Sequence, residues 1–232
     1  FESLTLSGNR NWRYYGEVDL IYLARNQGRF NASLSRFNGI LKAVDGDSEF
    51  EGMVCELLQE RSMQYAMMNN FPVAIRDAER SVKRLLKDKV NGPVYGRQGY
   101  GSVLARSNDL QKAETVAEEL KRDIENIDST QMNSYWRVIG EIERKKGNTP
   151  ASLSAWQKAA KGNTLFSRHV MLGLSYLDAN KPGEAVAEFE RLKLDHWNSD
   201  RFTQFGTFAS YYLGMAYEKS GWTDKAIGQY EE

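Results

Sequence analysis

The feature that most constrains this sequence is a set of residue types that recurs along the chain at similar spacing. Near the C-terminus, Leu213-Gly214 is followed by a tyrosine, a turn glycine, an alanine and a second tyrosine. Leu172-Gly173 begins a closely similar order of residue types 41 residues earlier. Working back, six units can be aligned, and such units fold as a stack of similar pieces in which each covers the next. One small residue per unit sets the alignment, at intervals of 33 to 41 residues: Ser33, Ala74, Ala113, Ser152, Ala185 and Ala226.

Turn residues predict that each unit is a pair of helices. The turn between the two helices needs a residue that tolerates left-handed backbone, and asparagine or glycine recurs there. Pro72, Pro150 and Pro182 come at the start of a second helix, where a missing N–H is harmless, and Pro93 comes at the start of a first helix. The predicted turns are Asn69-Asn70, Asn108-Asp109, Gly147-Asn148, Asn180-Lys181 and Gly221-Trp222.

Glycine inside the first helix of four units predicts a close helix crossing. Glycine costs about 1 kcal/mol relative to alanine in a helix interior, so a packing contact must offset that cost. We expect the small residue of the second helix to face it, as Ala185 would face Gly173, because two minimal side chains let two backbones approach closely. The four sites are Gly101, Gly140, Gly173 and Gly214.

The order Leu-Gly, Tyr, turn, Ala, Phe or Tyr resembles the tetratricopeptide repeat (TPR), and the resemblance covers roughly residues 14 to 232. It implies an all-α fold, an α-solenoid in which helix pairs form a right-handed superhelix, with first helices lining a concave groove and second helices on the convex back. The early units depart from the pattern, with Ile21 and Ser62 in place of the glycine. We expect one solenoid segment over 1–232, with units at 14–47, 55–90, 93–127, 133–164, 166–195 and 206–232, from a longer protein.

Composition removes several other classes of function. Thirty-one Lys+Arg balance 31 Asp+Glu, so the chain lacks the basic excess of a nucleic-acid binder and we expect no nucleic acid as partner. The longest uncharged run, 202–217, is too short and too polar to cross a bilayer, which needs about 20 apolar residues. One cysteine excludes a disulfide framework but does not fix the compartment. The location is therefore unknown, with the cytoplasm slightly favoured over a periplasmic or extracellular location.

The inventory for catalysis or metal binding is thin. Neither His169 nor His196 has a second ligand at metal-binding spacing, and Cys55 has no histidine near it in the sequence. Gly99-Tyr100-Gly101 does not continue into a dinucleotide-binding motif. We therefore predict a non-enzymatic chain with no cofactor and no metal, and we assign His169 to helix packing.

The resemblance, together with helical periodicity, predicts which residues line the concave face. A mixture of tyrosine, methionine and arginine would suit adaptable apolar contact and acidic groups of a protein or peptide partner. The fifth unit contributes an apolar stripe, Val170, Leu174 and Leu177, that the next repeat or the long insertion at 193–205 is expected to cover. The predicted partner-binding residues are Tyr15, Tyr22, Arg25, Gln59, Met63, Met67, Tyr95, Gln98, Ser102, Arg106, Arg137, Glu141, Arg144, Tyr211 and Met215.

The resulting prediction is a non-catalytic scaffold that binds a protein or peptide as an interaction module of a larger protein. Two alternatives stay open. The first is a self-association module, a homo-oligomer formed through the apolar faces of terminal repeats. The second is a regulatory repeat region attached to a catalytic domain outside this segment. A basic run in the second repeat, 55–90, is assigned to the C-terminal end of a helix, where positive charges interact favourably with the helix dipole: Arg80, Lys83, Arg84, Lys87 and Lys89.

Overall fold

The computed structural model describes residues 5–6, 8–87, 92–161, 166–195 and 209–231. Within these ranges the chain forms twelve α-helices, two short 3₁₀ helices and no β-strand, so the prediction of an all-α fold is confirmed. The 3₁₀ helices are η1 (Ser48–Phe50) and η2 (Ser129–Gln131). The α-helices are α2 (Arg10–Asn26), α3 (Phe30–Val44), α4 (Glu51–Met67), α5 (Phe71–Leu85), α6 (Gly92–Arg106), α7 (Leu110–Ile127), α8 (Met132–Lys145), α9 (Thr149–Ala160), α10 (Phe166–Asp178), α11 (Pro182–Asp195), α13 (Ala209–Lys219) and α14 (Thr223–Tyr230).

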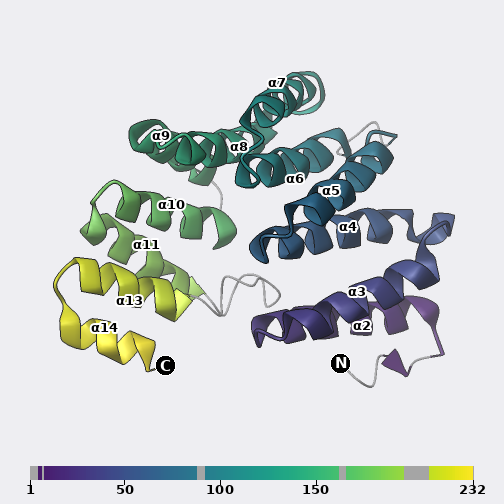
Figure 1. The fold of residues 1–232 in the computed structure, drawn as a ribbon, viewed down its shortest axis with the longest axis horizontal. Coiled ribbons are helices and arrows are strands. Elements are labelled where there is room, and N and C mark those ends of the chain that lie inside the picture. Colours follow the sequence, from purple (N-terminus) through teal and green to yellow (C-terminus); the bar gives the residue numbers. More distant parts are fainter. Residues whose placement is uncertain (1–4, 7, 88–91, 162–165, 196–208, 232) are drawn as a thin grey trace. The chain divides into compact units, whose positions relative to one another are not determined.

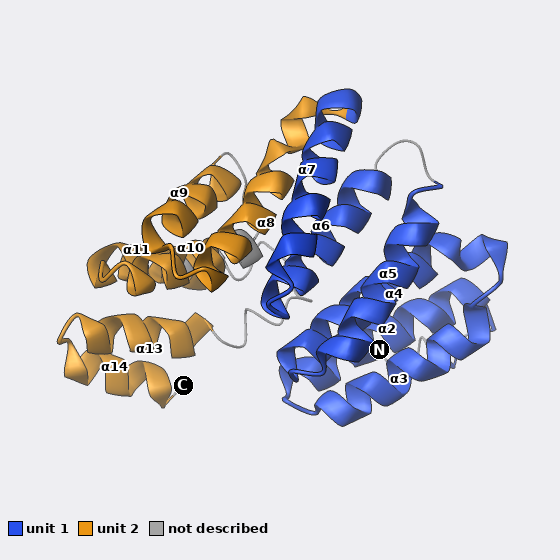
Figure 2. Cartoon of the chain, turned by 45° about the horizontal axis from the view of Figure 1, so that its top comes forward, with its two compact units in different colours: residues 1–127 blue, residues 128–232 orange. Residues whose placement is uncertain are grey.

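These helices pack in consecutive pairs as hairpins (Figure 1): α2 with α3, α4 with α5, α6 with α7, α8 with α9, α10 with α11, and α13 with α14. The chain divides into two compact units, residues 1–127 and 128–232, coloured separately in Figure 2. In the first unit, α4 packs on α3 and α6 packs on α5 and α4. In the second, α10 packs on α9 and α13 packs on α11 and α10. Each unit is therefore a stack of three hairpins, while a single continuous array over 1–232 stays a prediction.

All six hairpins make the same turn. One residue in each has φ between +56° and +76°, the left-handed region that asparagine and glycine tolerate. The N–H of the next residue then donates to the carbonyl five residues earlier, at 2.8 to 3.1 Å, which closes a Schellman cap. The prediction of the turns is confirmed, and Gly28 adds the first hairpin to the series. The left-handed residues are Gly28, Asn69, Asn108, Gly147, Asn180 and Gly221.

Three of the four predicted glycines inside first helices are explained by an aromatic ring, which corrects the expected contact. A Cβ on Gly173 would lie 2.5 Å from Cε1 of Phe189, and the three atoms nearest to it all belong to that ring and not to Ala185. Gly140 faces Trp156 and Gly214 faces Tyr230 in the same way. The absent side chain therefore makes room for a large residue on the second helix.

The small residues that set the alignment are buried in every hairpin, with at most 3% of each exposed. They let the second helix approach, and where the residue is serine its hydroxyl is satisfied. Ser152 Oγ, for example, donates to the carbonyl of Gly140 at 3.0 Å, which ties α9 to α8. The small residue thus lets the two helices approach, whereas the aromatic residue one turn later fills the space beside the glycine of the first helix.

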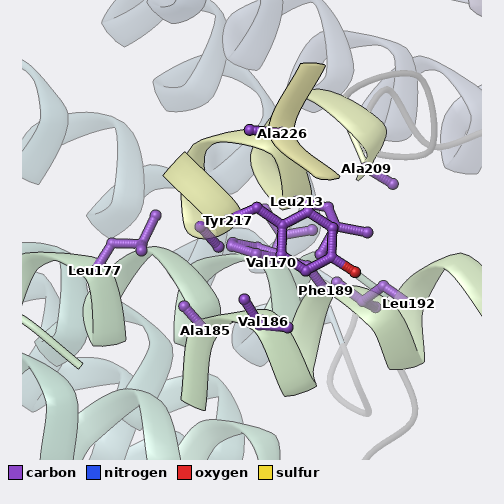
Figure 3. Packing of buried hydrophobic residues seen from close by; sticks show 11 residues of the cluster. Val170, Leu177, Ala185, Val186, Phe189, Leu192, Ala209, Leu213, Tyr217 and Ala226 are labelled. Atoms are coloured by element: carbon purple, nitrogen blue, oxygen red, sulfur yellow. The ribbon is translucent and has the colours of Figure 1, made fainter. Parts of the chain in front are cut away.

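The core of the second unit continues from one hairpin into the next (Figure 3). Val170 and Leu177 of α10 share a cluster with Phe189 of α11 and with Ala209 and Leu213 of α13. Val170 is fully buried, Leu177 is 4% exposed, and Leu174 packs against the same cluster. The apolar stripe is therefore covered by the next repeat, as one of the two expected covers; the other, the insertion at 193–205, lies largely outside the described residues.

Candidate protein-interaction face

The sequence-predicted residues of the first unit fall on three first helices, α2, α4 and α6, which we call the A face of unit 1. Tyr15 on α2 and Tyr95 on α6 are 55% and 42% exposed, large values for aromatic side chains. Tyr22, Met63 and Met67 are half-buried, as are Gln59, Gln98 and Arg106. The A face therefore offers tyrosine and methionine surface flanked by polar groups.

Side chains of α2 and α4 meet in an ionic cluster. Arg25 of α2 is 4% exposed, and its Nη1 lies 2.8 Å from Oε2 of Glu60 on α4. The same guanidinium lies over the ring of Tyr22, 4.8 Å from its centroid. Because Arg25 already has these partners, its charge fixes two helices together and is largely neutralised before any ligand arrives.

Two titratable groups of this cluster have shifted pKa values. Burial, followed by the negative charges of Glu60 and Glu56, raises the pKa of the Tyr22 hydroxyl well above its usual value. Removal of water around its carboxyl, and then the charge of Glu60, raise the pKa of Glu56, although part of that side chain is exposed. The tyrosine therefore stays protonated and can donate a hydrogen bond.

Contacts between α4 and α6 position the other half of the A face. Gln59 Nε2 donates to the carbonyl of Tyr95 at 3.1 Å, and the amide of Gln59 lies against Gly99, where a Cβ would be 2.6 Å from Oε1. One turn further, Nη1 of Arg106 lies 3.0 Å from the sulfur of Met63. Predicted face residues of α4 and α6 are thus brought together side by side.

The carboxylates Glu56 and Glu60 were missed as members of this face. The signal was present, because Glu56, Gln59, Glu60 and Met63 share one side of a helix by the i, i+3, i+4, i+7 rule. The predicted set takes Gln59 and Met63 from this side of α4 and leaves out the two carboxylates between and before them. The A face of unit 1 is consequently mixed in charge, with carboxylates on α4 and Arg106 in the last turn of α6.

Buried side chains among the predicted residues have structural surroundings. Ser102 is 1% exposed, and its Oγ has no hydrogen-bond partner within the described part of the chain. Glu141 of the second unit is 4% exposed. With Arg25, these residues lie beneath the surface, so a ligand would reach them only after local rearrangement.

In the second unit, the predicted residues lie on α8 and α13. Arg144, at the end of α8, pairs with Asp178 at the end of α10, with Nε to Oδ2 at 2.7 Å. Arg137 is half-buried. Tyr211 is 52% exposed, and Met215 packs against the core cluster that α13 shares with α10 and α11. Tyr211 is therefore the exposed aromatic of this set.

Charged groups outside the face are engaged in packing. Arg80 and Arg84 on α5 both pair with Asp45, and Nη1 of Arg84 lies 2.6 Å from Oε2 of Glu51. His169 is 4% exposed, with Nδ1 2.8 Å from Oε2 of Glu188, in agreement with its assignment to helix packing.

Across the described ranges, no group of three His, Cys, Asp or Glu side chains is arranged to hold a metal ion. None of the described helices is long and apolar enough to span a bilayer.

Known proteins resemble this chain in structure and not detectably in sequence. No protein-family model matches the sequence, and no curated protein matches it. A tetratricopeptide repeat protein from Parabacteroides merdae ATCC 43184 matches 99% of this chain and 81% of its own, with 12% identity and a TM-score of 0.55. The TPR-like repeats of a kinesin light chain from Podosopora anserina match 77% of this chain and 93% of their own, with 13% identity and a TM-score of 0.52.

These similarities, together with six like hairpins, define the class of protein. The chain has a TPR-like fold, an all-α solenoid of helix hairpins. At such low identity the similarity concerns the fold, and it transfers no partner from the two matched proteins.

Proposed function

We propose that the chain is a non-catalytic scaffold that binds a peptide segment of a partner protein on the A face of unit 1. The observation that carries the proposal is the exposure of Tyr15 and Tyr95 on first helices of one unit. Tyrosine is enriched at interface hot spots because it offers a large rigid surface with a polar end. Two such rings that are exposed on one face contribute little to packing within the chain and suit a surface that binds a partner.

The charges of this face suggest how the peptide is oriented. Arg106 lies in the last turn of α6, whereas Glu56 lies in the second turn of α4. An acidic group of the peptide would therefore bind at the Arg106 end of the face and be repelled at the Glu56 end. Arg25 and Arg144 contribute less to recognition, because each is already paired with a carboxylate.

Selection from a random peptide library displayed on phage, with the whole chain as bait, tests the proposal. Tyr95→Ser is expected to weaken selected peptides about tenfold or more, the effect of a hot-spot residue. Leu86→Ser is the matched control, because Leu86 is 43% exposed at the end of α5, which is a second helix and not part of the A face. Arg106→Ala should weaken the peptides that carry Asp or Glu. Peptides that bind the wild type and the Tyr95 variant equally would contradict the proposal.

A further inference from the structure

The repeat register places Glu56 in the middle of a row of equivalent positions on the A face of unit 1. It lies six residues before Ser62, at the position that Tyr15 holds in α2 and Tyr95 holds in α6. α4 lies inside the stack of unit 1, since it packs on α3, α5 and α6. The exposed side chain of Glu56 therefore belongs to the middle of this face, between two tyrosine positions.

Glu56 differs from the other glutamates of α2 and α4 in its charge partners. Each of the three others pairs with an arginine at 2.6 to 2.8 Å. Within the described part of the chain, no lysine, arginine or histidine pairs with Glu56, and no positive charge offsets the effects of burial and of Glu60 that raise its pKa. A cation brought by a ligand would therefore stabilise the ionised carboxylate. The paired glutamates are Glu17, Glu51 and Glu60.

Two observations bring Glu56 and Tyr95 to the same part of the face. Gln59 follows Glu56 by one turn on the same side of α4, and its Nε2 donates to the carbonyl of Tyr95 at 3.1 Å. Burial and then the charge of Glu60 raise the pKa of the Tyr22 hydroxyl, and Glu56 and Tyr95 add to this increase. Both side chains are therefore close to the Tyr22 hydroxyl.

Arg25 shows how this surface holds a guanidinium. Its Nη1 lies 2.8 Å from Oε2 of Glu60, and the same group lies over the ring of Tyr22, 4.8 Å from the centroid. One carboxylate and one tyrosine ring thus hold an arginine of the chain itself. Glu56 and Tyr95 are the same two residue types, and Tyr95 is 42% exposed.

We propose that the carboxylate of Glu56 and the ring of Tyr95 bind an arginine side chain of the peptide on the A face of unit 1. This inference rests on the proposed function and names a side chain that the peptide carries. Arginine fits better than lysine, because a planar guanidinium can both pair with a carboxylate through two hydrogen bonds and stack on a ring. Repulsion from Arg25 is reduced, since Glu60 already pairs with it.

The positions of the two charges also predict the spacing within the peptide. Tyr95, which is equivalent to Glu56, and Arg106 are 11 residues apart on α6. At 1.5 Å per residue this separation is about 16 Å along the helix. An extended peptide covers it with about five residues. We therefore expect the arginine of the peptide about five residues from the acidic residue that binds at Arg106.

The arginine site is first tested without a peptide. N-acetylarginine amide is titrated into the whole isotope-labelled chain, and the amide chemical shifts are followed by NMR. Resonances around Glu56 and Tyr95 should shift and saturate at millimolar concentration, whereas the neutral isostere N-acetylcitrulline amide should leave them unchanged.

Protein variants assign this binding to the carboxylate. Glu56→Gln should weaken binding of N-acetylarginine amide about fivefold or more, because the charge is lost while the size is kept. Glu118→Gln, an exposed change on α7, is the matched control and should leave the affinity intact. Equal shifts with the citrulline compound, or equal affinity of wild type and the Glu56 variant, would overturn the proposal.

Peptide selection separates this inference from the proposed function. The wild-type bait should enrich arginine about five residues from Asp or Glu, and the Glu56→Gln bait should not. Peptides that depend on Tyr95 without a preference for arginine would overturn this inference and leave the proposed function standing. Binding of N-acetylarginine amide at Glu56 by a chain that selects no peptide would support the arginine site and contradict the proposed function.

Light scattering tests the other source of an arginine, a second copy of this chain. We expect the Glu56→Gln variant and wild type to have the same molecular mass. A wild-type oligomer that dissociates with Glu56→Gln would assign the site to an arginine of a second copy, which overturns the proposal.

Discussion

Gly173 of α10 lies directly against the ring of Phe189 on α11, so closely that a methyl group at Gly173 would be 2.5 Å from Cε1 and 2.6 Å from Cζ. Carbon atoms in ordinary van der Waals contact are about 3.5 to 4.0 Å apart. The ring must therefore move if any side chain is added. The glycine and the phenylalanine form one packing unit, 16 residues apart, and Gly140 with Trp156 and Gly214 with Tyr230 repeat it at the same separation.

Replacing Gly173 with alanine is expected to destabilise the fold by about 1 to 3 kcal/mol, the usual cost of overpacking. This loss should appear although alanine favours a helix by about 1 kcal/mol over glycine. Urea unfolding of the second unit within the whole chain measures it. Gly183→Ala on α11 is the matched control, because nothing lies within 4 Å of its added Cβ, and it should be neutral or stabilising. Equal losses from the two variants would show that Phe189 does not occupy the space at Gly173.

The turn asparagines give a second stability prediction. Asn180 has φ +56°, and its N–H and that of Lys181 donate to carbonyls of α10. Asn180→Ala should lower the free energy of unfolding by about 1 kcal/mol, since left-handed backbone costs roughly that much for a residue with a Cβ and no local hydrogen bond. Asn180→Gly should be neutral or slightly stabilising. Thermal melts of the two variants measure the difference, and an alanine variant as stable as the glycine variant would contradict the prediction.

Turns such as the one at Asn180 could be predicted from sequence because their requirement is local. A left-handed residue is needed after each first helix, and few residue types satisfy that need. The register followed from the recurring small residue and agreed with these turns, so burial of Ala185 and its equivalents could also be predicted. What faces Gly173 could not, because Ala185 and Phe189 lie one turn apart on the same helix and only the packed geometry selects between them.

The candidate site was less accessible to sequence reasoning for a related reason. Periodicity assigns Arg25 to a helix face. Its pairing with Glu60, 35 residues further along the chain, depends on how α2 and α4 approach each other. Tyr15 and Arg25 were placed on the same face, yet one is 55% exposed and the other 4%. Charge is recognised in a sequence, whereas its neutralisation by a neighbouring hairpin is a tertiary property.

The buried pair of Arg61 and Asp77 gives a third prediction. Asp77 is fully buried and accepts from Nε and Nη2 of Arg61 at 2.7 and 2.9 Å. Asp77→Ala should destabilise the protein by about 3 to 5 kcal/mol, because it leaves a guanidinium buried without its carboxylate.

The control for this pair is Asp178→Ala, which breaks the exposed pair with Arg144. It should cost at most about 1 kcal/mol, the usual value of a surface ion pair. Chemical denaturation of both variants decides the matter. Similar small losses would mean that Asp77 is replaceable and that the pair does not hold α4 to α5.

The last prediction concerns Glu79, whose carboxylate joins α5 to the third hairpin. It accepts hydrogen bonds from Tyr100 Oη at 2.6 Å and from Lys112 Nζ at 2.9 Å, and these bonds lower the pKa of Glu79 below its usual value. Because the folded-state pKa is depressed, unfolding takes up a proton near the unfolded-state pKa, and the stabilisation is present above that value. It is lost as the pH falls through the lower, folded-state pKa.

Glu79→Gln should therefore destabilise the protein at pH 7, and its deficit relative to wild type should shrink as the pH falls below about 4.5. The deficit should stay below about 1 kcal/mol, since the carboxylate is about one third exposed and solvent screens the pair. Urea unfolding of both proteins between pH 3 and 7 measures it. Glu118→Gln, an exposed change on α7, is the control and should leave the free energy of unfolding at pH 7 close to that of wild type. A Glu79 deficit that is constant over this range would mean that shape, and not charge, sets its contribution to the junction.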